Sequence, residues 1–165
     1  MVVEILQDYS QKIIEELKQN LLERDKFASG GLAQSITANV KVMGQVIEMT
    51  ISMADYWKFV DEGVDGTERK HGSPFKFRKK NINQKAMLQH IANRGLRVKA
   101  KTSKGKKAAR KGLAFVLGRS IAKKGLKPTR FASDVFEGDL IDNMRKDVAK
   151  ALGRDILIDL TVDFK

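Results

Sequence analysis

The sequence predicts an α+β protein, with a long N-terminal helix and further helices packed on a small antiparallel sheet. Residues 3–26 have the three- and four-residue apolar spacing of an amphipathic helix. Residues 35–53 alternate apolar and polar side chains with the period of two that strands require, and residues 134–152 return to helical spacing. Because a small sheet has an apolar face that must be covered, we expect the helices to lie on one face of it.

The first helix is expected over residues 3–26, followed by Gly30 and Gly31 as its stop signal, since glycine tolerates the positive φ found at many helix ends. Its apolar stripe includes Ile5, Leu6, Tyr9, Ile13, Leu17 and Leu21. Such a stripe can serve a partner helix. Packing against the sheet of the same chain is the simpler interpretation.

The next elements are a β-hairpin over residues 35–53, interrupted at Gly44, and a short helix or turn over 55–62. Trp57 could stack on a nucleic-acid base, but its aromatic and apolar neighbours favour a packing role. Alternation over residues 156–163 predicts a C-terminal strand that joins the hairpin.

Length and composition limit the class of protein. The 165 residues, 42% of them hydrophobic, fit one domain over 1–165. The chain has no cysteine, which excludes disulfides, thiolate nucleophiles and Cys-based zinc sites. Neither a signal peptide nor a membrane-spanning helix is expected, since no apolar run approaches the ~20 residues that a span needs.

Charge is divided into three blocks along the chain. Residues 69–130 contain 21 Lys/Arg and no Asp/Glu, whereas residues 1–68 carry a net charge of −6 and residues 131–165 a net charge of −3. The formal net charge of +12 therefore arises from one basic segment between two mildly acidic ends. Such a segment must face phosphates, acidic protein or water.

Within the basic segment, apolar spacing predicts helices over residues 83–93 and 113–124. Residues 97–111 hold eight Lys/Arg in 15 residues without periodicity, and we interpret them as a flexible arm that contacts a partner or DNA. The cationic side chains of this arm are Lys99, Lys101, Lys104, Lys106, Lys107, Arg110 and Lys111.

Three interpretations of the basic segment remain open at this point. It is a solvated insertion, an electrostatic nucleic-acid contact that neutralises phosphates without reading bases, or a docking surface for acidic protein. Phe115 is the only aromatic residue between Phe77 and Phe131, so stacking on single strands has little support. The segment also lacks a zinc finger, heptads or a clear helix-turn-helix.

Catalytic chemistry finds no support in the sequence. His71 and His90 both lie within the acid-free segment, and the carboxylates at residues 61, 62 and 65 are more simply loop charges. Residues 103–106 resemble a phosphate loop in composition but not in spacing, and Ser120 has no plausible base. We expect a protein that is not an enzyme, without catalytic, cofactor-binding or metal sites; a nuclease-type enzyme is the weakest alternative.

Two motifs flank the basic segment. Residues 31–36 (GLAQSI) precede the hairpin, which is followed by residues 54–66 (ADYWKFVDEGVDG), and residues 119–131 read RSIAKKGLKPTRF. This order resembles that of the tail-completion proteins of tailed bacteriophages, the neck or head–tail joining family of minor tail components. There, the tyrosine-to-glycine and Pro-x-x-Phe segments flank an insertion of variable length. Gly118 and the unusually basic insertion depart from the common pattern.

The resemblance implies a virion structural protein that is made in the host cytoplasm and assembles into a homo-oligomeric ring, with a hexamer expected because tail tubes are sixfold. The ring would join the tail to the head connector, contacting neck, head-closure and tail-tube proteins and genomic DNA in the lumen. The alternative is a small non-specific nucleic-acid-binding protein. The motif residues expected to have structural roles are Tyr56, Phe59, Val60, Gly63, Arg119, Ser120, Gly125, Pro128 and Phe131.

Overall fold

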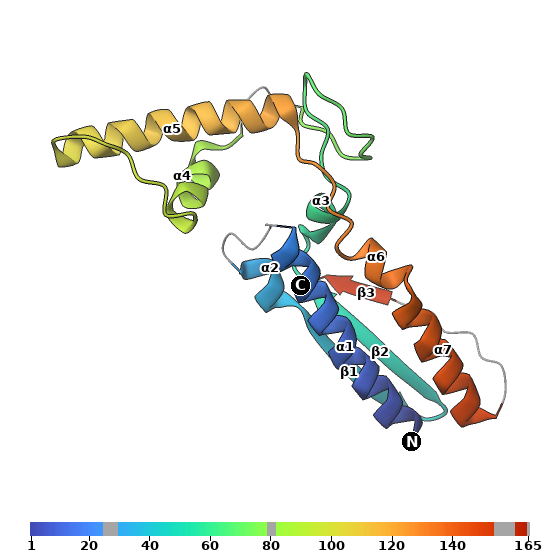
Figure 1. The fold of residues 1–165 in the computed structure, drawn as a ribbon. Helices are drawn as coiled ribbons and strands as arrows, with labels where there is room; N and C mark the ends of the chain where they lie inside the picture. The colour runs from blue at the N-terminus through green and yellow to red at the C-terminus, as the bar shows by residue number, and fades with distance from the viewer. Residues whose placement is uncertain (25–29, 79–81, 154–160, 165) are drawn as a thin grey trace. The chain divides into compact units, whose positions relative to one another are not determined.

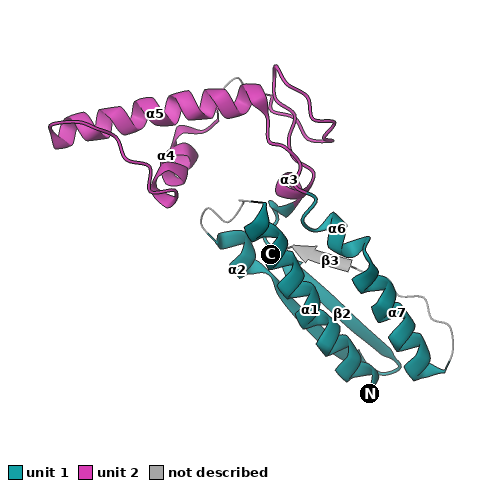
Figure 2. Ribbon diagram, in the orientation of Figure 1, with its two compact units in different colours: residues 1–57, 130–165 teal, residues 58–129 magenta. Residues whose placement is uncertain are grey.

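The computed structural model describes residues 1–24, 30–78, 82–153 and 161–164. Its internal contacts divide the chain into two compact units, one formed by residues 1–57 with 130–165 and the other by residues 58–129 (Figure 2). We expected one domain over 1–165. The central segment instead leaves the first unit and has a small apolar core of its own.

The first unit combines helices with a three-stranded sheet, which confirms the α+β class (Figure 1). Its elements are α1 (Val2–Glu23), α2 (Gly31–Ser35), β1 (Thr37–Met43), β2 (Val46–Met53), α6 (Ser133–Phe136), α7 (Asp139–Leu152) and β3 (Thr161–Phe164). The short helix α2 was not expected, because residues 30 and 31 were interpreted only as a stop signal. Gly30, with φ of 66°, is the N-cap of α2.

The predicted hairpin is confirmed. Strands β1 and β2 pair in antiparallel fashion, with Thr37 opposite Ser52 and Met43 opposite Val46. Gly44 has a φ of 62°, as the first position of a tight two-residue turn of type II′ requires. Met49, Ile51 and Met53 on one face of β2 are buried, whereas Glu48 on the other face is exposed.

The third strand joins the hairpin as expected, but in the opposite direction to the one predicted. β3 pairs in parallel with β2, from Thr50 opposite Thr161 to Met53 opposite Phe164. A tight turn forces neighbouring strands to be antiparallel, but β3 follows a long connection that contains α7, and such a connection permits parallel pairing. Residues 156–160 of the predicted strand lie outside the described residues.

The apolar stripe of α1 forms the core of the first unit. Ile13, Leu17 and Leu21 are fully buried, and α1 contacts β1, β2, α2, α6 and α7. The stripe therefore packs within its own chain, as the simpler interpretation held.

A single helix was predicted over residues 134–152, but the structure has two helices there, α6 and α7. Gly138 separates them with an extended ψ of 175°, and a Cβ at this position would lie 2.6 Å from the carbonyl oxygen of Asp134. α7 begins immediately afterwards and ends at Gly153, whose φ is 65°. Apolar spacing alone does not reveal the break, because the stripe continues on both sides of it.

The second unit contains most of α3 (Trp57–Asp61), together with α4 (Gln84–Asn93) and α5 (Ser103–Lys124) (Figure 1). The predicted helix over 83–93 is confirmed as α4, with Asn83 accepting a hydrogen bond from Lys85 N at its start. At its end Gly95 has a φ of 62° and Leu96 N donates to Ile91 O, the pattern of a Schellman cap.

We expected a flexible arm over residues 97–111. This prediction is wrong for residues 103–111, which form the first turns of α5. Thr102 caps this helix by accepting a hydrogen bond from Gly105 N at 3.1 Å. Lysine, arginine and alanine are strong helix formers. These turns are mostly exposed, so no apolar periodicity marks them in the sequence.

Tyr9 offers a test of the packing of α1 on α7. Its hydroxyl donates to Asp147 Oδ2 at 2.6 Å, and this bond, with burial and the nearby carboxylate charges, raises the pKa of Tyr9 from 10.0 to about 12. The folded state therefore holds the phenolic proton more tightly than the unfolded chain does. The stabilisation is complete below pH 10 and is lost as the pH rises towards 12.

We expect Tyr9→Phe to lower the free energy of unfolding by about 1 kcal/mol near neutral pH. The difference from the wild type should shrink above pH 10, as followed by urea unfolding with the fluorescence of Trp57, the single tryptophan. Asp147→Asn, which keeps an acceptor but removes the charge, should lose part of the effect. A difference that does not change with pH would show that this hydrogen bond does not stabilise the fold.

Candidate interaction site on a basic helical hairpin

Helices α4 and α5 form a helical hairpin with its own apolar contacts. Met87, Ile91 and Ala114 are buried between the two helices. The partly buried apolar residues packed around them are Ile82, Leu88, Leu113, Leu117 and Ile121. This small core orders α4 against the second half of α5, and the first half of α5 continues beyond it.

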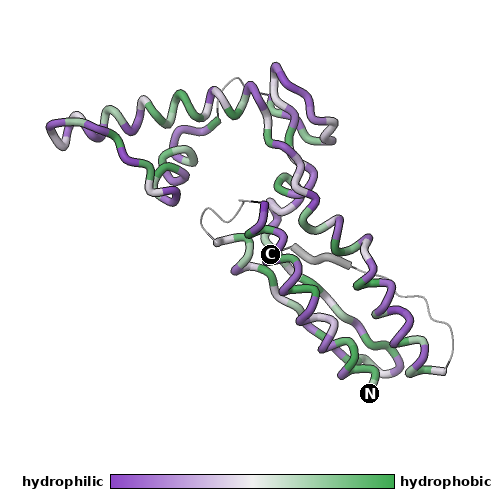
Figure 3. Tube along the Cα trace, viewed as in Figure 1, coloured by the Kyte–Doolittle hydropathy of each residue, from purple (hydrophilic) through white to green (hydrophobic). Residues whose placement is uncertain are grey.

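The surface of this hairpin is cationic. Residues 84–124 contain 13 Lys/Arg and no Asp/Glu, and the whole second unit has 21 against 4, a net charge of +17. The rest of the chain has 11 against 16, a net charge of −5. Hydrophilic residues recur along α5 and the connection before it (Figure 3).

All seven predicted contact residues lie on this surface and are exposed. Lys99 and Lys101 precede α5, and the other five are in its first three turns. Within the described part of the chain, none of the seven takes part in an ion pair. Their charges are therefore available to an external anionic surface.

The outer side of α5 also exposes two large apolar side chains that the sequence prediction missed. Phe115 is 49% exposed and Val116 is 61% exposed. In the sequence they lie between Leu113 and Leu117, so no break in the apolar pattern separates them from the residues that pack on α4. Helical angles of 100° per residue place them away from the side that packs on α4.

The base of the hairpin is closed by a short pairing that we call the clasp, residues 60–66 against 122–129. Val64 and Leu126 exchange two backbone hydrogen bonds, of 2.9 and 2.7 Å. The Thr129 hydroxyl donates to Val60 O at 2.7 Å. The clasp therefore joins the two sequence motifs that flank the basic segment.

Three glycines make the clasp sterically feasible, and a Cβ on one of them, Gly66, would overlap the Lys123 carbonyl. The other two, Gly63 and Gly125, have φ values of 73° and 74°. A Cβ on Gly63 would overlap the Leu126 carbonyl and lie 2.6 Å from Pro128 N, and one on Gly125 would overlap the Val64 carbonyl. The backbones approach so closely that no side chain fits at any of these positions.

The loop after Gly66 satisfies the C-terminal end of α5. The carbonyl of Ala122 accepts from Thr67 N, and that of Lys123 accepts from the next two backbone amides. The Lys124 carbonyl pairs with the His71 ring through Nε2 at 2.8 Å. These carbonyls have no partner within the helix, so the loop both caps α5 and fixes its direction at the clasp.

Asp65 organises this loop. Its Oδ1 accepts from His71 N at 2.6 Å and from Ser73 N at 3.2 Å. The bond from His71 is the main cause that lowers the pKa of Asp65, with burial acting against it. Phe75, which follows in the same loop, packs edge to face on Phe59 with ring centroids 4.6 Å apart. The carboxylate has a structural function.

The remaining motif residues have different environments. Phe131 is fully buried in the first unit, whereas Tyr56 is 42% exposed. Arg119 and Pro128 are exposed and Ser120 is half-buried. The structure therefore brings together only those motif residues that form the clasp and its surroundings in the second unit.

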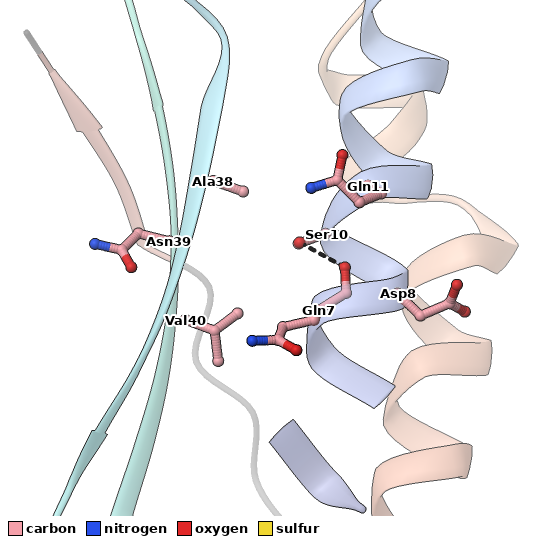
Figure 4. Close-up of a pocket in the computed structure, with 7 residues that line it drawn as sticks. All are labelled: Gln7, Asp8, Ser10, Gln11, Ala38, Asn39 and Val40. Carbon is pink, nitrogen blue, oxygen red and sulfur yellow. Dashed lines mark hydrogen bonds between the residues drawn. The ribbon is translucent and has the colours of Figure 1, made fainter. Parts of the chain in front are cut away.

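The first unit has a groove of about 550 Å³ between α1 and β1 (Figure 4). Ala38 and Val40 point towards α1, Asn39 points away, and Ser10 donates to Gln7 O at 2.7 Å. Asp8 is the single ionisable residue among its lining, and it pairs with Lys12. This set offers no acid–base pair.

Among the described residues, no group of three His, Asp or Glu side chains is placed to hold a metal ion. No helix in the same part of the chain is long and apolar enough to cross a bilayer. Comparisons with protein-family models, with curated proteins and with solved structures find no match. The functional inference therefore depends on the clasp and the hairpin.

The clasp glycines provide a stability test with an internal control. We expect Gly63→Ala to destabilise the second unit through two effects, the left-handed φ at about 1–2 kcal/mol and overlap with the opposite backbone at about 1–3 kcal/mol. Gly95→Ala carries the φ cost alone, since nothing lies within 4 Å of its Cβ position. Thermal unfolding followed by circular dichroism, with amide exchange in the last turn of α5, measures both. Equal losses in the two variants would contradict the close approach at the clasp.

Proposed function

We propose that the protein is a structural virion subunit of a tailed bacteriophage, a tail-completion ring that joins the tail to the head connector and acts without catalysis. One observation carries this proposal. The two segments on which the resemblance to tail-completion proteins rests are hydrogen-bonded to each other, and they close the base of a cationic hairpin.

The clasp gives this resemblance a physical basis. In that family the same two segments flank an insertion of variable length. Here they bring the two ends of the intervening segment together through the Val64–Leu126 bonds. Loop-closure entropy grows slowly with length, so a closed base tolerates insertions of different size and charge. The hairpin is then the part adapted to a particular neighbour.

A ring would use the hairpin for contact. Closed cyclic rings are built from heterologous interfaces, which require two different complementary surfaces on each subunit. The net charges of +17 and −5 on the two units supply surfaces of opposite sign. The partners would be further copies of the chain in a hexamer, the adjacent neck, head-closure and tail-tube proteins, and DNA in the lumen.

The second candidate is a non-specific nucleic-acid-binding protein. The observation in its favour is the set of seven exposed cations without a carboxylate partner in the described chain. Phosphate contacts of this kind need no base-reading motif, and their affinity falls steeply with salt.

A fourfold Lys→Gln variant at positions 104, 106, 107 and 111 tests the role of the hairpin. Glutamine keeps the helix propensity of lysine, so circular dichroism and thermal unfolding should remain as in the wild type. Incorporation into virions, measured by complementation of a phage that lacks this protein, should be lost. The matched control changes Lys18, Lys41, Lys146 and Lys150, four exposed lysines of the first unit, and should still assemble.

DNA retention at increasing salt separates the two candidates. A ring-forming protein that barely retains DNA supports the neck function. A monomer whose log affinity falls linearly with log salt supports the alternative, and the fourfold variant should then reduce that slope by roughly 3 to 4. Normal assembly of the fourfold variant would show that the hairpin is a solvated insertion.

A further inference from the structure

We infer that copies of this chain join through the outer side of α5 in one copy and the solvent-facing side of α1 in the next. This inference rests on the proposed ring function and names the two surfaces that would form the ring. Both surfaces combine charge with an exposed apolar residue, and their charges have opposite signs.

The α5 surface is a ridge of residues spaced by four. Lys111, Phe115 and Arg119 follow one another along it, and all three are exposed. Val116 lies on the adjacent ridge, one turn after Gly112, whose Cβ position has nothing within 4 Å. The surface is therefore apolar at its centre, cationic at both ends and open to close approach by another helix.

The α1 surface has the matching pattern. Glu15, Gln19 and Glu23 are exposed and also spaced by four, and Gln19 donates to Glu23 at 2.8 Å. Leu22, 56% exposed, lies beside them. Neither glutamate takes part in an ion pair within the described residues. α1 as a whole has five acidic residues against two lysines.

Charge selects this pairing over the alternatives among copies of the chain. Contact between two α5 surfaces would bring two acid-free hairpins together, and contact between two α1 surfaces would set carboxylates against each other. Each costs repulsion that the α5–α1 contact avoids. Because the two surfaces differ, the contact is heterologous, which is the geometry that a closed ring requires.

The apolar residues favour protein over nucleic acid as the occupant of the α5 surface. Phosphates would neutralise Lys111 and Arg119 but leave Phe115 and Val116 in water. A helix with an exposed leucine next to a carboxylate, such as Leu22 beside Glu23, covers the apolar side chains and pairs the cations at the same time.

Two variants each remove the charges of one surface. Lys111→Gln with Arg119→Gln changes α5, and Glu15→Gln with Glu23→Gln changes α1. Asp139→Asn with Asp142→Asn, on exposed residues of α7, is the matched control. Self-association of the full chain is measured by sedimentation velocity and native mass spectrometry. Each of the first two variants should self-associate at least roughly tenfold more weakly than the wild type, and the control should associate as the wild type does.

Mixing the two variants gives the sharper result. Each retains the surface that the other lacks, so the mixture should form 1:1 dimers that do not extend. A single chain with Lys111→Glu, Arg119→Glu, Glu15→Lys and Glu23→Lys should recover the wild-type oligomer. A zero-length carbodiimide cross-link between Lys111 and Glu15 or Glu23, formed in a mixture of ¹⁴N and ¹⁵N wild-type chains, should join peptides of different isotope.

Other outcomes overturn the inference in distinguishable ways. Wild-type rings with unaffected variants would reject these surfaces but keep the proposed ring. A wild type that stays monomeric at all concentrations would reject both. Cross-links confined to one isotope would place the contact within a single chain. Loss of DNA retention with unchanged self-association in the α5 variant would make this surface a nucleic-acid site.

Discussion

The backbone pairing of Val64 with Leu126 is the interaction on which the second unit depends. It brings together the two ends of the chain segment that contains α4 and α5, and the glycines on either side permit the approach. The loop that caps the last carbonyls of α5 begins directly after this pairing and is organised by Asp65. Without it, the direction of α5 would be fixed only by a small apolar core on one side of the helix. The clasp therefore closes the basic segment into a compact unit with a defined helical structure.

The helical structure of this segment changes what its positive charge can do. A flexible basic arm loses conformational entropy when it binds, whereas cations on a preformed helix lose mainly side-chain freedom. The charges repel one another in the free protein, since no acidic residue interrupts residues 69–133. Association with an anionic surface relieves this repulsion. The hairpin thus has both a geometric and an electrostatic reason to bind, and neither requires a catalytic group.

Several elements could be predicted from the sequence because their signal is local. The β-hairpin of β1 and β2 follows from the alternation on both sides of Gly44. Apolar spacing predicts α1, and apolar spacing with the cap at Asn83 predicts α4. The first turns of α5 were missed because a mostly exposed helix has no apolar stripe, although Thr102 and the Lys/Ala composition favoured it. The direction of β3 and the pairing of Val64 with Leu126 depend on contacts between distant segments. No local pattern encodes these contacts, and the exposure of Phe115 likewise follows only once the helix that carries it is placed against α4.

The exposed cations of the second unit and the residues that stabilise the clasp are different sets. In the clasp, the glycines permit the close approach of the two backbones. The backbone groups and the Thr129 hydroxyl form hydrogen bonds inside the second unit. The five exposed cations in the first three turns of α5 have no such role in the fold, because none of them has an ion-pair partner among the described residues, whereas Lys123 in the last turn pairs with Glu68. Thirteen like charges on one hairpin weaken a fold unless something outside it compensates. In the proposed assembly, another molecule would compensate these charges, and the protein would then be more stable there than in isolation.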